Sequence, residues 1–227
     1  MTGVETLVDC RGLTRLFGKG EAEVAAVRDV NGQVRHGQRI AVTGESGSGK
    51  STLLHLMAGL DTPTSGTVTW PGLTMRAGRP LGIGVVFQAP SLLPALDVTD
   101  NVALPLLLAD VPRSEARLRA EQALDRLGLT GLASSTPEEL SGGQAQRVAI
   151  ARVLAAEPAL VIADEPTGQL DRRTATHVLD VLLATVGSLG AALVVSTHDP
   201  EVADRLDVRW AMADGRRREP APQVGAR

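Results

Sequence analysis

The feature that most constrains this fold is the eight-residue run Gly44-Glu45-Ser46-Gly47-Ser48-Gly49-Lys50-Ser51. It matches the pattern G-x-x-x-x-G-K-[ST], and it lies between a predicted strand at 39–43 and a predicted helix at 50–60. Glycines let the backbone curl so that consecutive N–H groups face phosphate oxygens, and the helix N-terminus adds partial positive charge. The pattern therefore predicts a strand, a phosphate-binding loop and a helix in succession.

Three side chains of this loop have predicted roles. Lys50 would reach the β- and γ-phosphates, Ser51 would coordinate Mg²⁺, and Thr52, the next residue of the helix, is a further predicted nucleotide-binding residue. The chain contains 23 Lys and Arg residues, of which only Lys19 and Lys50 are lysines. A planar guanidinium cannot replace a slim ammonium inside such a loop. The alternative, a Gly/Ser-rich turn without a ligand, is disfavoured by the flanking strand and helix.

A second chemical feature is the pair of carboxylates that ends the apolar strand predicted at 160–163. Neighbouring strand residues face opposite sides, so Asp164 and Glu165 can have separate tasks. Asp164 would join the Mg²⁺ ligands, and Glu165 would orient the attacking water. Solvated loop carboxylates are an equally good interpretation of this motif alone. Together with the phosphate loop, the catalytic interpretation is favoured.

A third feature is Leu140-Ser141-Gly142-Gly143-Gln144 at the start of a predicted helix. Ser141 and the amides of Gly142 and Gly143 would form an anion site without a lysine. The alternative is a simple helix cap, since Ser is a good N-cap. In this order the three motifs resemble those of ABC ATPases, and the resemblance extends over about 7–215. It implies a homodimer in which the signature segment (140–144) of one copy closes on ATP bound by the other.

The resemblance implies roles for four further residues. Gln88 matches a glutamine that contacts Mg²⁺ and links to the helical lobe, and His198 matches a histidine that touches the γ-phosphate. Asp171 matches the acidic member of a loop, 167–171, that crosses the dimer interface. Phe17 stands where the family usually stacks adenine on tyrosine, and this chain has no tyrosine. Stacking requires only an aromatic face, but a plain core role for Phe17 is the alternative.

Alternating strand and helix patterns predict an α/β fold with a mostly parallel sheet. The resemblance adds a P-loop NTPase (RecA-like) core, an N-terminal antiparallel β subdomain and an inserted α-helical subdomain at about 89–156, within a domain at 1–215. Turns are expected at Asn31-Gly32 and His36-Gly37, and Ser114 is the expected N-cap of a helix at 114–127. The residues after Gly215, 216–227, are expected to be disordered. Further strands are expected at 6–17, 25–34, 67–70, 84–87 and 192–196, and further helices at 141–157 and 174–186.

Composition excludes several classes of protein. The net charge of −3 argues against a basic nucleic-acid surface, so no nucleic-acid partner is expected. No apolar run approaches the roughly 20 residues of a membrane helix, and the N-terminus lacks a signal pattern. The single cysteine, Cys10, cannot form an internal disulfide. We therefore expect a cytoplasmic protein that is peripheral to the membrane through another protein.

Several strings resemble one ABC subfamily, the macrolide-export and lipoprotein-release (MacB/LolD-like) type. They are Gly-Leu-Asp-Thr-Pro-Thr-Ser-Gly (59–66), Asn-Val-Ala-Leu-Pro-Leu-Leu-Leu (101–108) and Ala-Asp-Glu-Pro-Thr-Gly (163–168). Such subunits pair with FtsX-like permeases. The resemblance therefore implies either a transport ATPase that drives export, which is the first expectation, or a regulatory mechanotransmission ATPase of the FtsE type. Departures are Gln169 in place of the usual asparagine, and a short segment at 71–82. A soluble ABC ATPase of DNA repair or translation is disfavoured. Such proteins usually have two of these domains in one chain or a long coiled-coil insertion, and the 53 positions between Gln88 and Ser141 leave no room for one.

Overall fold

The computed structural model describes residues 5–218, apart from the side chain of Glu21. The chain divides into two compact units. Of the described residues, the first contains those up to Pro80 together with those from Val194 onward, and the second extends from Leu81 to Leu193. The division falls within strand β9 (Ala192–Thr197), so this strand contributes to both.

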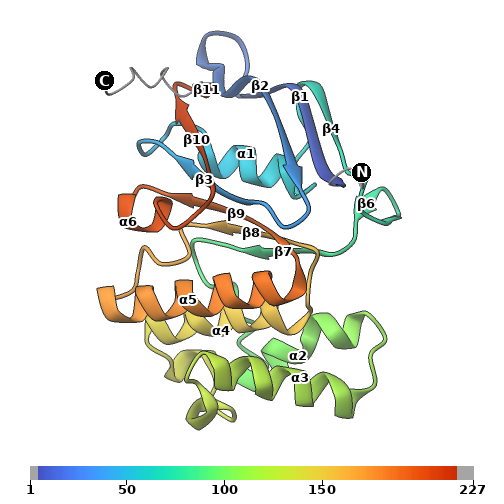
Figure 1. Ribbon diagram of the computed structural model, residues 1–227, viewed down its shortest axis with the longest axis vertical. Coiled ribbons are helices and arrows are strands. Elements are labelled where there is room, and N and C mark those ends of the chain that lie inside the picture. The colour runs from blue at the N-terminus through green and yellow to red at the C-terminus, as the bar shows by residue number, and fades with distance from the viewer. Residues whose placement is uncertain (1–4, 219–227) are drawn as a thin grey trace, which may run out of the picture. The chain divides into compact units, whose positions relative to one another are not determined.

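The first unit contains an antiparallel sheet in the order β2-β1-β4. Its strands are β1 (Thr6–Phe17), β2 (Val24–Arg35) and β4 (Ser65–Thr69), with a short 3-10 helix η1 (Gly20–Ala22) between β1 and β2 (Figure 1). Apolar side chains on β1, including Leu7, Val8 and Leu13, are almost fully buried. The predicted N-terminal antiparallel subdomain is confirmed by these pairings.

The turn predicted at Asn31-Gly32 is wrong, because β2 continues through both residues. A Cβ atom added to Gly32 would lie 2.7 Å from the Trp210 ring, so glycine is needed for a close approach within a strand. The Asn31 side chain accepts a hydrogen bond from the Gly12 amide at 2.8 Å, which is a sheet contact and not a turn contact. The turn at His36-Gly37 is present, and Gly37 has a φ of 72°.

The first unit also contains the mixed strand order β11-β10-β3, continued by β9. Strands β3 (Arg39–Thr43) and β10 (Val208–Ala213) are parallel, and β11 (Arg216–Arg218) is antiparallel to β10. The disorder expected after Gly215 is therefore wrong for 216–218, which pair with an existing edge strand; 219–227 lie outside the described residues. Helices α1 (Lys50–Met57) and α6 (Pro200–Ala203) and the hairpin strands β5 (Met75–Arg76) and β6 (Arg79–Pro80) complete the unit.

The second unit consists of strands and helices around one central helix. Strands β7 (Ile83–Val86) and β8 (Leu160–Asp164) are parallel, and the Ala192 amide at the start of β9 donates to the Ala159 carbonyl. The helices are α2 (Val98–Leu108), α3 (Arg113–Arg126), α4 (Gly142–Ala155) and α5 (Arg172–Leu189), with 3-10 helices η2 (Thr130–Leu132) and η3 (Pro137–Glu139). Helix α4 packs against β7, α2, α3 and α5 (Figure 1).

The predicted N-cap at Ser114 is wrong, because α3 begins at Arg113 and Pro112 occupies the cap position. Proline fixes φ near the helical value and lacks the N–H that a first turn leaves unpaired, so it suits a helix start.

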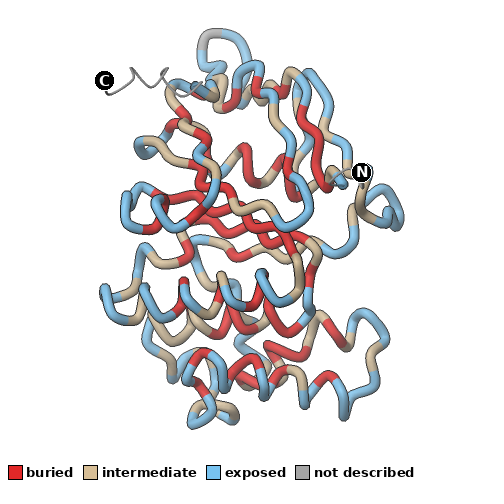
Figure 2. Tube along the Cα trace, viewed as in Figure 1, coloured by how far each residue is buried: buried red, intermediate tan, exposed pale blue. Residues whose placement is uncertain are grey.

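All five residues of β8 and all six of β9 are buried, as expected for parallel strands covered on both faces (Figure 2). Among the described residues, no helix combines the length and apolar character needed to span a membrane.

Candidate functional site

The phosphate loop lies in the first unit, between β3 and α1. Gly44 and Gly49 have φ values of 152° and 97°, which L side chains rarely adopt. A Cβ atom on Gly49 would collide with the Ala26 carbonyl, and one on Gly44 would collide with the Met212 carbonyl. The surrounding strands therefore enforce glycine at both ends of the loop, which keeps its backbone amides uncovered by side chains.

Lys50 begins α1 and folds back over this loop. Its Nζ donates to the carbonyl oxygens of Gly44 and Glu45, each at 2.9 Å, and the residue is 6% exposed. The ammonium group therefore lies over the curve of the backbone, where a phosphate oxygen would be met. Ser48 Oγ is buried and has no hydrogen-bond partner among the described residues. A hydroxyl without a partner and a lysine held over the loop both fit a phosphate group.

The hydroxyl residues Ser51 and Thr52 lie in the first turn of α1. Ser51 is exposed and Thr52 is partly buried. The outer part of the loop consists of Glu45, Ser46 and Gly47, which are all exposed. A Cβ atom added to Gly47 would meet no other atom within 4 Å.

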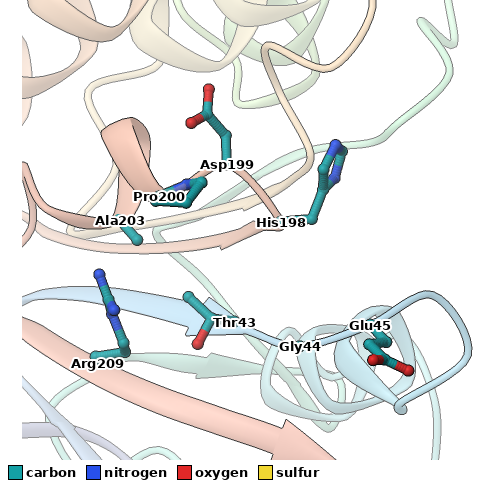
Figure 3. Close-up of a pocket in the computed structure, with 8 residues that line it drawn as sticks. All are labelled: Thr43, Gly44, Glu45, His198, Asp199, Pro200, Ala203 and Arg209. Carbon is teal, nitrogen blue, oxygen red and sulfur yellow. The ribbon is translucent and has the colours of Figure 1, made fainter.

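His198 follows β9 and lies across a pocket from the start of the phosphate loop (Figure 3). One wall is formed by residues between His198 and Ala203, and the other by Thr43, Gly44, Glu45 and Arg209. The pocket has a volume of about 330 Å³. Two hydrogen bonds hold the turn after His198: the Asp199 amide donates to Thr197 Oγ1, and Asp199 Oδ1 accepts from the Glu201 amide at the start of α6. His198 and the phosphate loop are thus neighbours in the same unit.

Phe17 ends β1, and 44% of its surface is exposed. The alternative interpretation of Phe17 as a core residue is therefore wrong. The Arg15 guanidinium lies 4.7 Å from the ring centroid, and Arg15 is itself paired with Asp61 at 2.9 Å. An exposed aromatic face at the edge of the unit is the feature that adenine stacking requires.

The acidic pair lies in the second unit. Asp164 is the last residue of β8 and is 6% exposed, and Glu165 follows it in a sharp turn closed by the Gly168 amide. Glu165 has a φ of 45°, a strained backbone of a kind that clusters at active sites. Gln88, which lies 77 positions earlier, approaches Glu165 with Nε2 at 3.5 Å from Oε2. The structure therefore brings together two predicted catalytic residues from distant parts of the chain.

The signature segment lies at the exposed start of α4. Ser141 caps the helix: its Oγ accepts from the Gln144 amide at 3.3 Å, and Gln144 Oε1 accepts from the Ser141 amide at 2.7 Å. The capping interpretation is therefore correct, and it leaves the helix N-terminus available to an anion. Gly142 and Gly143 lie beside the loop that ends at Asp171, since added Cβ atoms would meet Gln169 at 3.9 Å and Leu170 at 3.2 Å.

Asp171 caps α5. Its Oδ1 accepts from the Thr174 amide at 3.1 Å and its Oδ2 from the Thr174 hydroxyl at 2.6 Å. These hydrogen bonds, above all the one from the Thr174 hydroxyl, hold the pKa of this exposed carboxyl below its ordinary value. Capping gives Asp171 a structural role, while the interface role remains a prediction.

The predicted site residues thus fall into two groups. The first unit contains Phe17, the phosphate loop with Ser51 and Thr52, and His198. The second contains Gln88, Asp164, Glu165, the signature segment and Asp171. Two side chains of α4 that were not predicted from the sequence, Gln146 and Arg152, contact the segment after β7. The one signal in the sequence was the presence of polar residues within an otherwise apolar helical pattern.

A family model and individual known proteins are both similar to this chain. The family model described as "ABC transporter" matches residues 27–168. The chain is 40% identical to a lipoprotein-releasing system ATP-binding protein LolD of Bordetella avium (95% of this chain, 97% of that protein). It is 41% identical to LolD of Geobacter metallireducens (94% and 98%).

Solved structures are also similar to this chain. The dimeric ATP-binding cassette MJ0796, in a post-hydrolysis state with ADP and Pi, is similar with a TM-score of 0.86 and 33% identity, over 97% of this chain and 100% of that chain. The cbiO1 protein of Clostridium perfringens is similar with a TM-score of 0.77 and 29% identity, over 95% and 88%.

Proposed function

Because the chain belongs to the ABC transporter family, as an ATP-binding and ATP-hydrolysing subunit, we propose that two copies close on two ATP molecules and drive an FtsX-like permease. The MacB/LolD-like subfamily supports export as the task, and the release of lipoproteins is the activity in the name of the similar LolD proteins. The proposed place of work is the inner face of the cell membrane, with the helical lobe at about 89–156 facing the permease.

The observation that carries this proposal is the exposed N-terminus of α4. Ser141 and Gly142 are exposed there, at a helix end that favours anions. The signature segment contains no lysine or arginine, whereas the phosphate loop has Lys50. Two anion sites in one chain, of which only one has a cation, suit a head-to-tail pair in which each triphosphate is held by both copies. The similar MJ0796 cassette was solved as a dimer.

We assign the nucleotide contacts as follows. In one copy, Phe17 stacks on adenine, and the phosphates are held by Gly44, Glu45, Ser46, Gly47, Ser48, Gly49, Lys50, Ser51 and Thr52. The other copy closes on the same ATP with Ser141, Gly142, Gly143, Gln144 and Asp171. Lysine supplies the charge and the loop amides supply directional donors, so the loop gives affinity and the second copy completes the site.

The proposed hydrolytic residues are Glu165, Gln88 and His198. Glu165 orients the attacking water and accepts its proton, while Gln88 and His198 bound the space around the γ-phosphate. Ser51, Gln88 and Asp164 provide the hydroxyl, amide and carboxylate oxygens that a hard cation prefers, so they are the proposed Mg²⁺ ligands. Bound Mg²⁺ would neutralise charge that develops on the phosphate oxygens.

Replacing Glu165 with glutamine tests the dimer. Glu165→Gln removes the base but no phosphate ligand, so the protein should form a stable dimer with ATP and Mg²⁺ and hydrolyse very slowly. Size-exclusion chromatography with light scattering measures the mass, and phosphate release measures hydrolysis. Glu121→Gln, on the exposed surface of α3, is the matched control and should behave as wild type. A Glu165→Gln protein that stays monomeric with ATP and hydrolyses at the normal rate contradicts the proposal.

The permease assignment needs a separate experiment. A tagged chain should copurify with an FtsX-like membrane protein, and recovery without any membrane protein contradicts both membrane functions. In vesicles that contain the complex, stimulation of ATP hydrolysis by lipoproteins or other export candidates supports transport. Hydrolysis that does not respond to any of them supports the regulatory function instead.

A further inference from the structure

Two side chains of α4 hold the segment between β7 and α2 that contains Gln88. This segment, 87–97, is named the glutamine loop here. Gln146 Nε2 donates to the Phe87 carbonyl at 3.2 Å, immediately before Gln88. Arg152 donates from Nη1 to the Ser91 carbonyl at 2.7 Å and from Nη2 to the Ser91 hydroxyl at 3.0 Å. The two contacts therefore bracket Gln88, one on each side.

Burial of these two polar side chains on α4 is unfavourable for the stability of the fold. Gln146 is 1% exposed, and its Oε1 has no hydrogen-bond partner among the described residues. An unpaired buried acceptor destabilises a fold, and an apolar residue of similar volume would avoid that loss. Arg152 is partly desolvated, which lowers the pKa of its guanidinium. Packing alone does not explain why Gln146 and Arg152 are polar. Their hydrogen bonds to the backbone of the glutamine loop do explain it.

A further anchor of the loop comes from α2. Asn101, which is fully buried, accepts from the Leu93 amide at 2.8 Å and donates to the carbonyls of Leu93, Leu96 and Asp97. It fixes the far part of the loop, while Gln146 and Arg152 contact the backbone on either side of Gln88. Gln88 and Ala89 themselves are exposed, and Gln88 Nε2 reaches Glu165 Oε2 only at 3.5 Å. A contact this long is sensitive to small displacements of the backbone that bears it.

We propose that Gln146 and Arg152 are positioning residues, which hold the glutamine loop so that the Gln88 amide stays against the Glu165 carboxylate. The proposal rests on the ATPase function and deepens it, since neither residue touches substrate. The same helix is capped by Ser141, so the position of Gln88 is tied to the helix that would meet the second copy's nucleotide. Closure on ATP would then move the signature segment and the glutamine loop as one body.

The test is a double-mutant cycle with Gln88. Gln146→Met keeps the volume and removes both the donor and the unpaired oxygen, and Arg152→Lys keeps the charge but cannot make two parallel bonds. Each should lower the kcat of ATP hydrolysis about tenfold while the KM for ATP changes by less than about twofold. In a Gln88→Ala background, followed under single-turnover conditions, neither substitution should have a further effect, because it acts through Gln88.

Arg147→Lys is the matched control for Arg152→Lys. Arg147 lies on the same helix but donates to the Leu127 carbonyl after α3, outside the glutamine loop. Its kcat should therefore stay within about twofold of wild type. A melting temperature close to wild type for Gln146→Met would exclude a general loss of structure as the cause of its lower kcat.

Three results would overturn the inference: unchanged kcat in both variants, equal losses in Arg147→Lys and Arg152→Lys, or full additivity with Gln88→Ala. If Arg152→Lys does not fold, Ser91→Ala removes one acceptor from the exposed loop and should give a smaller loss of kcat in the same direction; no loss overturns the role of Arg152. Absence of ATPase activity in the wild-type chain would instead contradict the proposed function, and the two failures are thus distinguishable.

Discussion

At the scale of a single residue, substitutions of Phe17 test how the protein holds the adenine base. Phe17→Ala should weaken ATP binding by about 1–3 kcal/mol, the range measured for stacking of bases on aromatic side chains. Phe17→Trp keeps an aromatic face and should bind nearly as well as wild type. Titration calorimetry with ATP measures both variants. Equal affinity in all three proteins would remove Phe17 from the site and leave its ring as a partner of Arg15 only.

Cys10 tests the rigidity of the antiparallel sheet. Burial, assisted by the negative charge of neighbouring Asp9, raises the pKa of the Cys10 thiol to about 12. The thiolate is the reactive form, so the native protein should not react with a thiol reagent such as Ellman's reagent at pH 8. After unfolding in denaturant, one thiol per chain should react. Rapid reaction of the native protein would show that β1 opens readily.

At the scale of an element, the cap of α5 links stability to pH. Hydrogen bonds from Thr174 hold the pKa of Asp171 below its ordinary value of 3.8, so the folded protein favours the ionised carboxylate. The resulting stabilisation is present above about pH 4 and is lost as pH falls through the lower folded pKa. Asp171→Ala should therefore lower the melting temperature at pH 7, and the difference from wild type should shrink in acid.

Asp171→Ser is the control for this cap, because serine also accepts from a first-turn amide. It should recover most of the lost melting temperature at pH 7, without the wild-type dependence on acid. Circular dichroism during heating, from pH 7 down to about pH 3, measures all three proteins. A difference between wild type and Asp171→Ala that grows in acid would contradict the assigned sign.

At the scale of the whole molecule, the proposed dimer predicts that two inactive chains can restore each other. Lys50→Ala removes the cation of the phosphate loop, and Ser141→Arg blocks the signature segment. In a mixed head-to-tail dimer, both defects fall in one composite site and the other site is intact. An equimolar mixture should therefore regain ATPase activity that neither variant has alone. Activity of the mixture no greater than the mean of its components would contradict a shared site.

Local chemistry explains what the sequence determined by itself. Three features each depend on residues that are close together in the sequence. They are the glycines of the phosphate loop, the capping box of Ser141 and Gln144, and the apolar runs of β8 and β9. Their backbone preferences and hydrophobic pattern need no distant partner, so the α/β class and the family resemblance could be predicted. Family resemblance also pointed to Gln88, Asp171 and His198, which composition and spacing alone would not have selected.

Contacts between distant segments decided the rest. The Trp210 ring lies against Gly32 within β2, and β10 pairs with 216–218. Helix α2 was not predicted, since Pro105 lies inside it; the helix packs against α3 and α4. The exposure of Phe17 and the hold of Gln146 and Arg152 on the glutamine loop also depend on segments far apart in the chain. Such contacts are set by packing and by the pairing of buried polar groups, for which no local propensity exists.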